Sequence, residues 1–475
     1  CRERQWTKRQ PSAKNLTQGL RASWREFGAQ VNRRHQRAVG QGFFHTAELE
    51  IEGDRKLRYV YDCGAMKKYA KQRNERIDEH LKSAGSNTVL DVLFISHIHF
   101  DHISGLERLL NKANGLQVDT IVMPLIDVAD RLFAYARAAN EDPATINDPF
   151  FRALMANPVK ALERFNPRQL LIVRRSSPDS GAPGSGRGGD DDPDGPLEIP
   201  RVWGGDRKDG LFWKLVGRGT WDEYDQVILK EDGTTTDTHA VIVDDTFAIM
   251  ASAPDGCCDW ILKPFVDPVI KSRKDLFLRE LARSRGMSVS ALKRWLQDTR
   301  NVSKLLKDGL PDLTTAYAAV SGDFNMTSLC LYSGPKNVTL EMEMRHSARR
   351  SSTGPRKKMM QVRRVGWLAT GDAALQVGTR AKAFKKQYDS HLQNTCTLTL
   401  PHHGSDHNHN AELIRRIGAT IHVAAADAYS NWKHPGTKVM QCLASMGRFL
   451  WVATSNKKSE IIETVHVRCR PKGKP

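Results

Sequence analysis

The run HIHFDH at residues 97–102 places four side chains that can bind metal ions within six positions. It follows directly after VLDVLFIS, a short apolar run typical of a strand buried on both faces. A turn after such a strand projects its side chains into one pocket, where imidazole and carboxylate groups suit zinc, manganese or iron. The run therefore predicts a metal site in which His97 and His99 can hold one ion and Asp101 and His102 a second.

Three later segments add side chains of the same kind near predicted strand ends. Thr370-Gly371-Asp372 ends the predicted strand 365–370, and PHHGS, with His402 and His403, follows the predicted strand 396–400. His434 stands in a Lys-His-Pro segment. Each of these is ordinary when taken singly. Together they supply the ligands that a two-metal site still lacks.

These motifs, in this order over about residues 39–450, resemble the metallo-β-lactamase fold superfamily of dinuclear metallo-hydrolases. The closest pattern is the branch with a His-His-Gly-Ser motif. That branch includes the hydrolase domain of bacterial DNA-uptake (competence) channel proteins and the phosphorylcholine esterases. The matching motifs besides HIHFDH are Val39-Gly40-Gln41-Gly42, Asp62-Cys63-Gly64, Asn325 with Thr327-Ser328-Leu329, Thr370-Gly371-Asp372, PHHGS and His434-Pro435.

The resemblance implies a mixed α/β fold, a four-layer αββα sandwich with helical and basic-loop inserts. It also implies two divalent metal ions, with zinc preferred and manganese or iron as alternatives. The implied ligands are His97, His99 and His403 for one metal, Asp101, His102 and His434 for the other, and Asp372 between the two.

Further roles follow from the same resemblance. Asp62 would orient the HIHFDH turn without binding metal. Two metals about 3.5–4 Å apart can share a hydroxide at neutral pH, and Asp101 could fix its orientation. His402 would donate a proton to the leaving group or contact substrate, although a packed supporting histidine is an equal alternative.

The predicted organisation is one hydrolase domain over residues 39–465, built from two weakly similar αβ halves. It lies between a basic N-terminal arm (1–38) and a basic tail (466–475). Three inserts enlarge it: a flexible Gly/Pro/Ser/Asp-rich loop at 176–200, a helical insert at 257–320 and a basic insert at 345–364.

The charge of the chain indicates a polyanionic partner, because 72 Lys and Arg against 54 Asp and Glu leave a net charge of +18. Most of the excess lies in residues 1–40 and in the basic insert. If that insert is a hairpin between strands 337–344 and 365–370, its base lies near the metals. Its tentative phosphate contacts are Arg349, Arg350, Arg356, Lys357, Lys358, Arg363 and Arg364.

These observations favour a metal-dependent phosphodiesterase or nuclease. Two alternatives stay open: a hydrolase of small acyl or phosphoester substrates (a lactone, thioester or phosphocholine ester), and a non-catalytic module of a multi-protein system. The basic insert could also be a merely solvated loop.

The cysteine pattern and the apolar runs bear on location. The eight cysteines show no CxxC spacing, which favours a reducing compartment such as the cytoplasm. No apolar run reaches the roughly 18 residues of a membrane span. Protein partners are not indicated.

Overall fold

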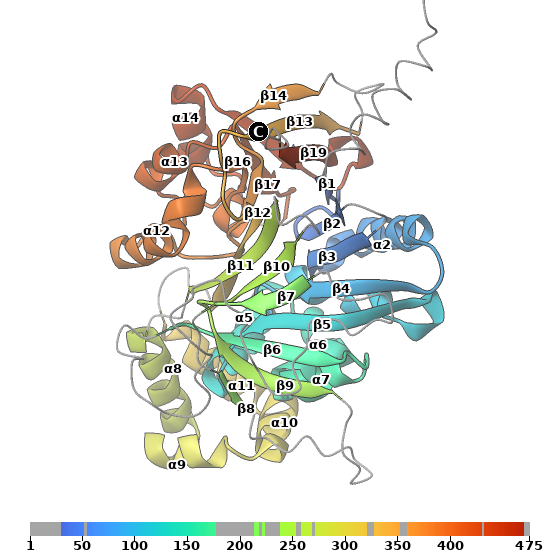
Figure 1. Cartoon of the computed structure of the whole chain (residues 1–475). Helices are drawn as coiled ribbons and strands as arrows, with labels where there is room; N and C mark the ends of the chain where they lie inside the picture. Colours follow the sequence, from blue (N-terminus) through green and yellow to red (C-terminus); the bar gives the residue numbers. More distant parts are fainter. Residues whose placement is uncertain are drawn as a thin grey trace, which may run out of the picture.

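The computed structural model describes residues 30–51, 55–176, 213–217, 221–223, 238–252, 258–267, 271–320, 327–351, 359–429 and 432–469. Two β-sheets lie face to face, and helices cover both outer faces (Figure 1). The predicted four-layer αββα sandwich is confirmed.

Sheet 1 contains both ends of the described chain. Its strand order is β14 (Met360–Val362), β13 (Met342–Arg350), β19 (Ile461–Cys469), β1 (Gln30–Gln36), β2 (Phe44–Ile51), β3 (Arg55–Cys63), β4 (Thr88–Phe94), β5 (Leu116–Pro124), β6 (Gln169–Arg174), β9 (His239–Asp244) and β8 (Trp221–Glu223). Strands β3, β4, β5, β6 and β9 run parallel, so their carboxyl ends share one edge of the sheet.

Sheet 2 is formed mainly by the second half of the chain. Its strand order is β18 (Phe449–Ala453), β17 (Ile421–Ala425), β16 (Thr395–Thr399), β15 (Gly366–Ala369), β12 (Ser328–Pro335), β11 (Asp259–Asp267), β10 (Ala248–Ser252) and β7 (Trp213–Val216). Strands β15 to β18 are parallel, and their carboxyl ends again share one edge.

The space between the sheets is filled by apolar side chains from both. Val92 and Phe94 of β4 pack in one cluster with Leu329 and Leu331 of β12 and with Trp367 of β15. β4 also turns Leu90 and Leu93 toward the helices on its other face. Burial on both faces explains why this strand has a continuous apolar run instead of alternation.

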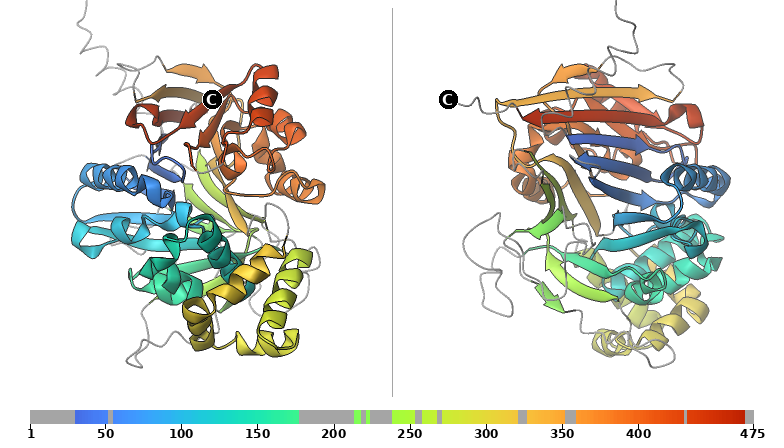
Figure 2. Two further views of the ribbon diagram at one scale, coloured as in Figure 1. Left: turned by 180° about the vertical axis from the view of Figure 1, so that it is seen from behind. Right: turned by 45° about the vertical axis from the view of Figure 1, so that its right-hand side comes forward.

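The outer face of sheet 1 carries the larger helical layer, and α12 to α14 cover sheet 2 (Figure 2). The helices on sheet 1 are α2 (Ala70–Ala84), α3 (Phe100–Ile103), α4 (Leu106–Leu109), α5 (Val128–Glu141), α6 (Pro149–Ala156) and α7 (Pro158–Glu163), and those on sheet 2 are α12 (Gly378–Leu392), α13 (Ala411–Ile417) and α14 (Thr437–Ser445).

Four more helices form a group beside α5 and α6 (Figure 1): three of them contact α5 or α6, and the fourth, α9, contacts α8. They are α8 (Lys271–Ser284), α9 (Val289–Trp295), α10 (Thr299–Asp308) and α11 (Leu310–Ala318). We refer to α5, α6 and α8 to α11 as the helical cap.

Several predicted segment limits differ from the structure. Residues 30–36 of the predicted arm form β1, which lies between β2 and β19, and β19 extends to residue 469 of the predicted tail. Residues 259–267 of the predicted helical insert form β11. Buried and more exposed side chains alternate along β1, and most side chains of β11 are buried. The charged residues nearby obscured both patterns in the sequence.

The basic insert does not form the predicted hairpin. Strand β13 pairs with β14 in sheet 1, whereas the strand that leads to Asp372, β15, lies in sheet 2. Segments 337–344 and 365–370 therefore do not pair, because the chain crosses from one sheet to the other between them. Residues 177–200 of the predicted flexible loop, and Arg356, Lys357 and Lys358, lie outside the described residues.

Among the helices that the structure describes, none has the length and apolar character needed to cross a membrane.

A buried polar network joins the two sheets behind the core. Glu463 of β19 accepts hydrogen bonds from His346 Nε2 (2.9 Å) and Thr397 Oγ1 (2.6 Å), and Arg34 Nη2 lies 3.4 Å from it. Burial alone would raise the pKa of Glu463, but Arg34 and His346 lower it to about 2. Burial alone would lower the pKa of His346, but contacts with Cys396 and Glu463 raise it to about 9.

This network predicts a pH dependence of stability. The folded pKa of His346 lies above its ordinary value of 6.5, so its contribution is complete below pH 6.5 and is lost as pH rises toward 9. The contribution of Glu463 is present above its ordinary pKa of 4.5 and is lost as pH falls toward 2. Urea unfolding of wild type and His346→Gln at a series of pH values tests this. The variant should lose less stability between pH 6.5 and 9 than wild type, and equal losses would contradict the assignment.

Candidate metal centre

The metal-ligating residues that the sequence singled out meet where the carboxyl ends of strands from both sheets face each other. HIHFDH follows β4, Asp372 follows β15, and His402 and His403 lie in the turn Pro401–Gly404 after β16. The loops are joined directly, because Leu329 N donates to Ser96 O (2.8 Å) and His402 N donates to Gly371 O (2.9 Å). Residues separated by some 300 positions thus surround one buried point.

Asp372 lies at the centre, and three imidazoles surround its Oδ2 atom. His97 Nε2 is 3.3 Å away, His99 Nδ1 is 3.6 Å away and His402 Nε2 is 3.6 Å away. Apart from His99, these side chains are almost wholly buried. The three ring nitrogens face one carboxylate oxygen, an arrangement that can enclose a single cation.

The other oxygen of Asp372 faces a second group. Its Oδ1 atom is 3.6 Å from His102 Nε2, which in turn is 3.9 Å from Asp101 Oδ2. His403 Nε2 lies 2.9 Å from the same Asp101 oxygen. The ligand atoms of Asp101, His102 and His403 lie within 4.8 Å of one another, as do those of His97, His102 and Asp372.

Asp62 and Ser96 support the imidazoles of the HIHFDH turn from behind. The Asp62 carboxylate accepts hydrogen bonds from Ser96 N (2.7 Å), Ser96 Oγ (2.6 Å) and His102 Nδ1 (2.7 Å). Ser96 Oγ donates to Asp62, so its lone pair can accept from His97 Nδ1 at 2.8 Å. These bonds engage Nδ1 of both rings, so the Nε2 atoms of His97 and His102 are directed inward.

The paired histidines are aimed by an unusual backbone. His402 and His403 have φ of 49° and 56°, the left-handed region that is costly for residues other than glycine. Outer hydrogen bonds then fix each ring. His403 Nδ1 lies 2.7 Å from Ala425 O, and His402 Nδ1 lies 3.3 Å from Asn408 Oδ1. Consecutive left-handed residues let adjacent side chains point to the two sides of Asp372.

The charges of the cluster compensate one another. Burial alone would raise the pKa of Asp372, but His402 and His97 hold it well below its usual range. Burial alone would lower the pKa of His102, but Asp101 and Asp62 raise it to about 9. The carboxylates are therefore ionised at neutral pH, as metal ligands must be.

The atoms present fit a metal ion. His102 Nε2 and Asp372 Oδ1 are buried and have no hydrogen-bond partner. Buried polar atoms are almost always satisfied, so this pair is suited to binding a cation. The His and Asp donor set suits zinc, manganese or iron.

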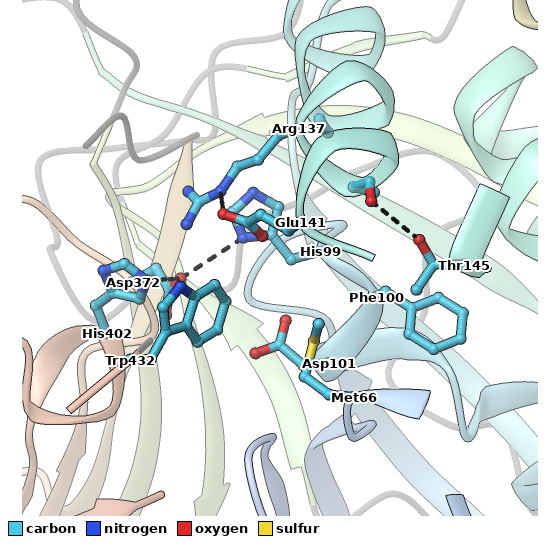
Figure 3. A pocket seen from close by; sticks show the side chains of 12 residues that line it. Met66, His99, Phe100, Asp101, Arg137, Glu141, Thr145, Asp372, His402 and Trp432 are labelled. Carbon is cyan, nitrogen blue, oxygen red and sulfur yellow. Dashed lines mark hydrogen bonds and ion pairs between the residues drawn. The ribbon is translucent and has the colours of Figure 1, made fainter. Parts of the chain in front are cut away.

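Two cavities that share lining residues open beside the cluster, and Figure 3 shows the residues around the smaller one. A hollow of about 20 Å³, enough for a water molecule or an ion, touches His99, Asp101, Asp372 and His402. A cleft of about 440 Å³ lies beside this hollow, and its lining includes His407, Trp432 and His434. The lining of both also includes Arg137 and Glu141 of α5.

The placement of the predicted residues differs in part from expectation. His403 groups with Asp101 and His102 instead of with His97 and His99, and His402 takes the place expected for it. His434 belongs to neither compact group among the described residues. It lines the cleft, and its ring centre lies 5.5 Å from that of His402.

The residues expected to contact phosphate lie in different parts of the structure. Arg364 Nη1 donates to the carbonyl oxygens of Ile417 (3.2 Å) and Gly418 (2.8 Å), so this residue stabilises the end of α13. Arg350 and Arg363 are exposed on the β13–β14 hairpin, and Arg349 is partly exposed. Three residues that line the site carry no motif that predicts them: Arg137 and Glu141 on α5, and Trp432 in the loop after β17.

Replacing Asp62 by asparagine should weaken zinc binding by about 10- to 100-fold, the usual cost of losing a partner behind a metal ligand. Asparagine tolerates the φ of 55° found at this position, so only the charge and one acceptor are lost. Competition with a chelating dye measures the affinity. Asn87→Asp, an exchange at the exposed left-handed residue Asn87 (φ 58°), is the matched control. Unchanged zinc affinity in Asp62→Asn would contradict the supporting role.

Comparison with known families agrees with the geometry. A family model described as the metallo-beta-lactamase superfamily matches residues 51–120, which include Asp62 and the whole HIHFDH run. No curated protein matches the chain significantly. The match supports the superfamily, and together with the clustered His and Asp residues it indicates a metal-dependent hydrolase.

Proposed function

We propose that the protein is a dinuclear metal-dependent phosphodiesterase that acts on nucleic acid. The observation that carries this proposal is the position of Asp372, whose two oxygens face two different sets of ligand atoms. A carboxylate in that position can bridge two cations. Two-metal sites of this kind serve in-line displacement at phosphorus, because they stabilise both the attacking and the leaving oxygen.

The division of ligands that we propose follows the interatomic distances given above. One metal would be held by His97, His99 and His402, and the other by Asp101, His102 and His403, with Asp372 shared. Zinc fits these ligands best, with manganese or iron as alternatives. When bound, the two ions supply a water that ionises near neutral pH and a Lewis acid for the substrate oxygen.

Two side chains near the metal ligands, Asp101 and His434, can assist the reaction directly. Asp101 lines the water-sized hollow, so its carboxylate can accept a hydrogen bond from the attacking water and orient it. His434, in the cleft, is placed to donate a proton to the leaving group. In this assignment His402 takes the role expected for His403, His403 the role expected for His434, and His434 the role expected for His402.

The basic hairpin supports a polymeric substrate. Through the sheet register, Arg350 is aligned with Ile461, Gln36, His45, Tyr61 and finally Phe94, which ends the strand before the HIHFDH turn. The hairpin thus reaches the same edge of sheet 1 as the metal centre, five strands away. At about 4.8 Å per strand this is roughly 24 Å, so a bound strand of several nucleotides could contact both. The similarity to the DNA-uptake branch adds support.

A second candidate is a hydrolase of small phosphoesters. The cleft of about 440 Å³ lies within the range of small-molecule sites, roughly 300–1,000 Å³. A substrate confined to the cleft would not reach the hairpin.

The proposal predicts that the zinc- or manganese-loaded protein cleaves DNA or RNA as well as bis-p-nitrophenyl phosphate, and that Asp372→Ala reduces all cleavage to background. DNA binding should weaken steeply between 50 and 200 mM salt, since several phosphate contacts would be lost to counterions. Cleavage that survives Asp372→Ala would overturn the dinuclear mechanism. Hydrolysis of small esters with no salt-dependent DNA binding would favour the second candidate.

A further inference from the structure

Helix α5 brings an arginine to the metal centre that no motif predicts. Arg137 is only 4% exposed, yet its side chain lines both the hollow and the cleft. Figure 3 shows it reaching from the helix toward the space that His99, Asp372 and His402 also face. Glu141, one helical turn later, accepts a hydrogen bond from Arg137 Nε at 2.7 Å.

Helices α8, α10 and α11 hold α5 in this position through residues that lie far away in the sequence. The Phe133 ring packs against Phe277 of α8 and Tyr317 of α11, with ring centres 5.4 and 5.0 Å apart. Tyr135 Oη donates to Leu306 O of α10 at 2.9 Å. Lys274 of α8 forms an ion pair with Asp130 of α5 at 3.1 Å. Residues 271–320, far from α5 in the sequence, thus hold one arginine beside the metal centre.

The charge of the metal centre limits what the Arg137 guanidinium can bind there. A site that holds two divalent metals stays positive after Asp101 and Asp372 are counted, so another buried cation is repelled unless an anion joins it. Glu141 offsets the charge of Arg137 when no substrate is bound. A guanidinium presents planar donors that match phosphate or carboxylate oxygens, whereas a neutral ester would gain little from it.

We propose that Arg137, positioned by Glu141, binds a non-bridging oxygen of a phosphate group in the substrate and thereby selects anionic esters over neutral ones. This inference rests on the proposed function, because it names the part of the same site that recognises phosphate. The helical cap then serves substrate selection, while the strand ends supply the chemistry.

The test measures inorganic phosphate binding by titration calorimetry, with the protein loaded with zinc and again with metal removed by a chelator. Arg137→Gln should weaken phosphate binding about tenfold or more in the loaded protein, since one charge-assisted contact is lost. Arg137→Lys should recover part of the affinity, because it keeps the charge without the planar fork. In the metal-free protein, wild type should bind phosphate more tightly than Arg137→Gln.

Two controls separate recognition from folding. Arg283→Gln removes the arginine of an exposed pair with Glu280 on the same cap and should leave phosphate binding unchanged. Arg137→Gln combined with Glu141→Gln removes both charges, so no unpaired buried carboxylate remains, and it should show the same loss as Arg137→Gln alone. Thermal unfolding confirms that each variant is folded.

Phosphate affinity within about twofold of wild type in the folded Arg137 variants would overturn the inference, even if the protein cleaves phosphodiesters. If the protein cleaves no phosphodiester but its phosphate affinity still depends on Arg137, the proposed function fails and the recognition site stands. With an active enzyme, Arg137→Gln should raise KM for bis-p-nitrophenyl phosphate more than for neutral p-nitrophenyl acetate.

Discussion

The burial of the Asp372 carboxylate between two sets of imidazoles is the constraint on which the rest of the site depends. An ionised carboxylate inside a protein costs several kcal/mol unless opposite charge or hydrogen bonds compensate it. The structure supplies that compensation from both sheets. Ser328 Oγ accepts from Asp372 N (3.0 Å), and Asn408 Nδ2 donates to Asp372 O (3.2 Å), so the loop itself is anchored as well. The start of β12 and the loops that follow β15 and β16 are thereby held to one geometry.

Chemistry and recognition come from different parts of the chain. The strand ends bring together groups that can bind two cations, and they do so on a two-sheet scaffold that many activities could share. We propose that substrate recognition comes from Arg137 of the helical cap, at the cleft, and from Arg350 of the β13–β14 hairpin, at the far strands of the same edge.

Much of the fold could be predicted from the sequence, because a strand such as β4 carries an apolar run that burial on both faces explains. The HIHFDH turn was predictable for the same reason, since its ligands are adjacent in the chain and follow such a strand. Strand β1 was not, because its charged residues resemble those of a solvated arm and its pairing partners are remote. The separation of β13 from β15 into two sheets depends on tertiary packing that no local pattern encodes.

The division of ligands was the least predictable part of the site. His402 faces Asp372 and His403 faces Asp101, and both have a left-handed backbone that no local sequence pattern predicts. Contacts with Gly371, in the loop after β15, and with Ala425, at the end of β17, hold this turn in place. Arg137 could not be predicted either, because its importance comes from where α5 is packed and not from its neighbours in sequence.

A crystal structure of the zinc-loaded protein with anomalous diffraction data at the zinc edge tests the central claim most directly. The account predicts two anomalous peaks, one on each side of Asp372, with His402 bound to one ion and His403 to the other. A single peak, or two peaks with His434 as a ligand in place of His402, would contradict it.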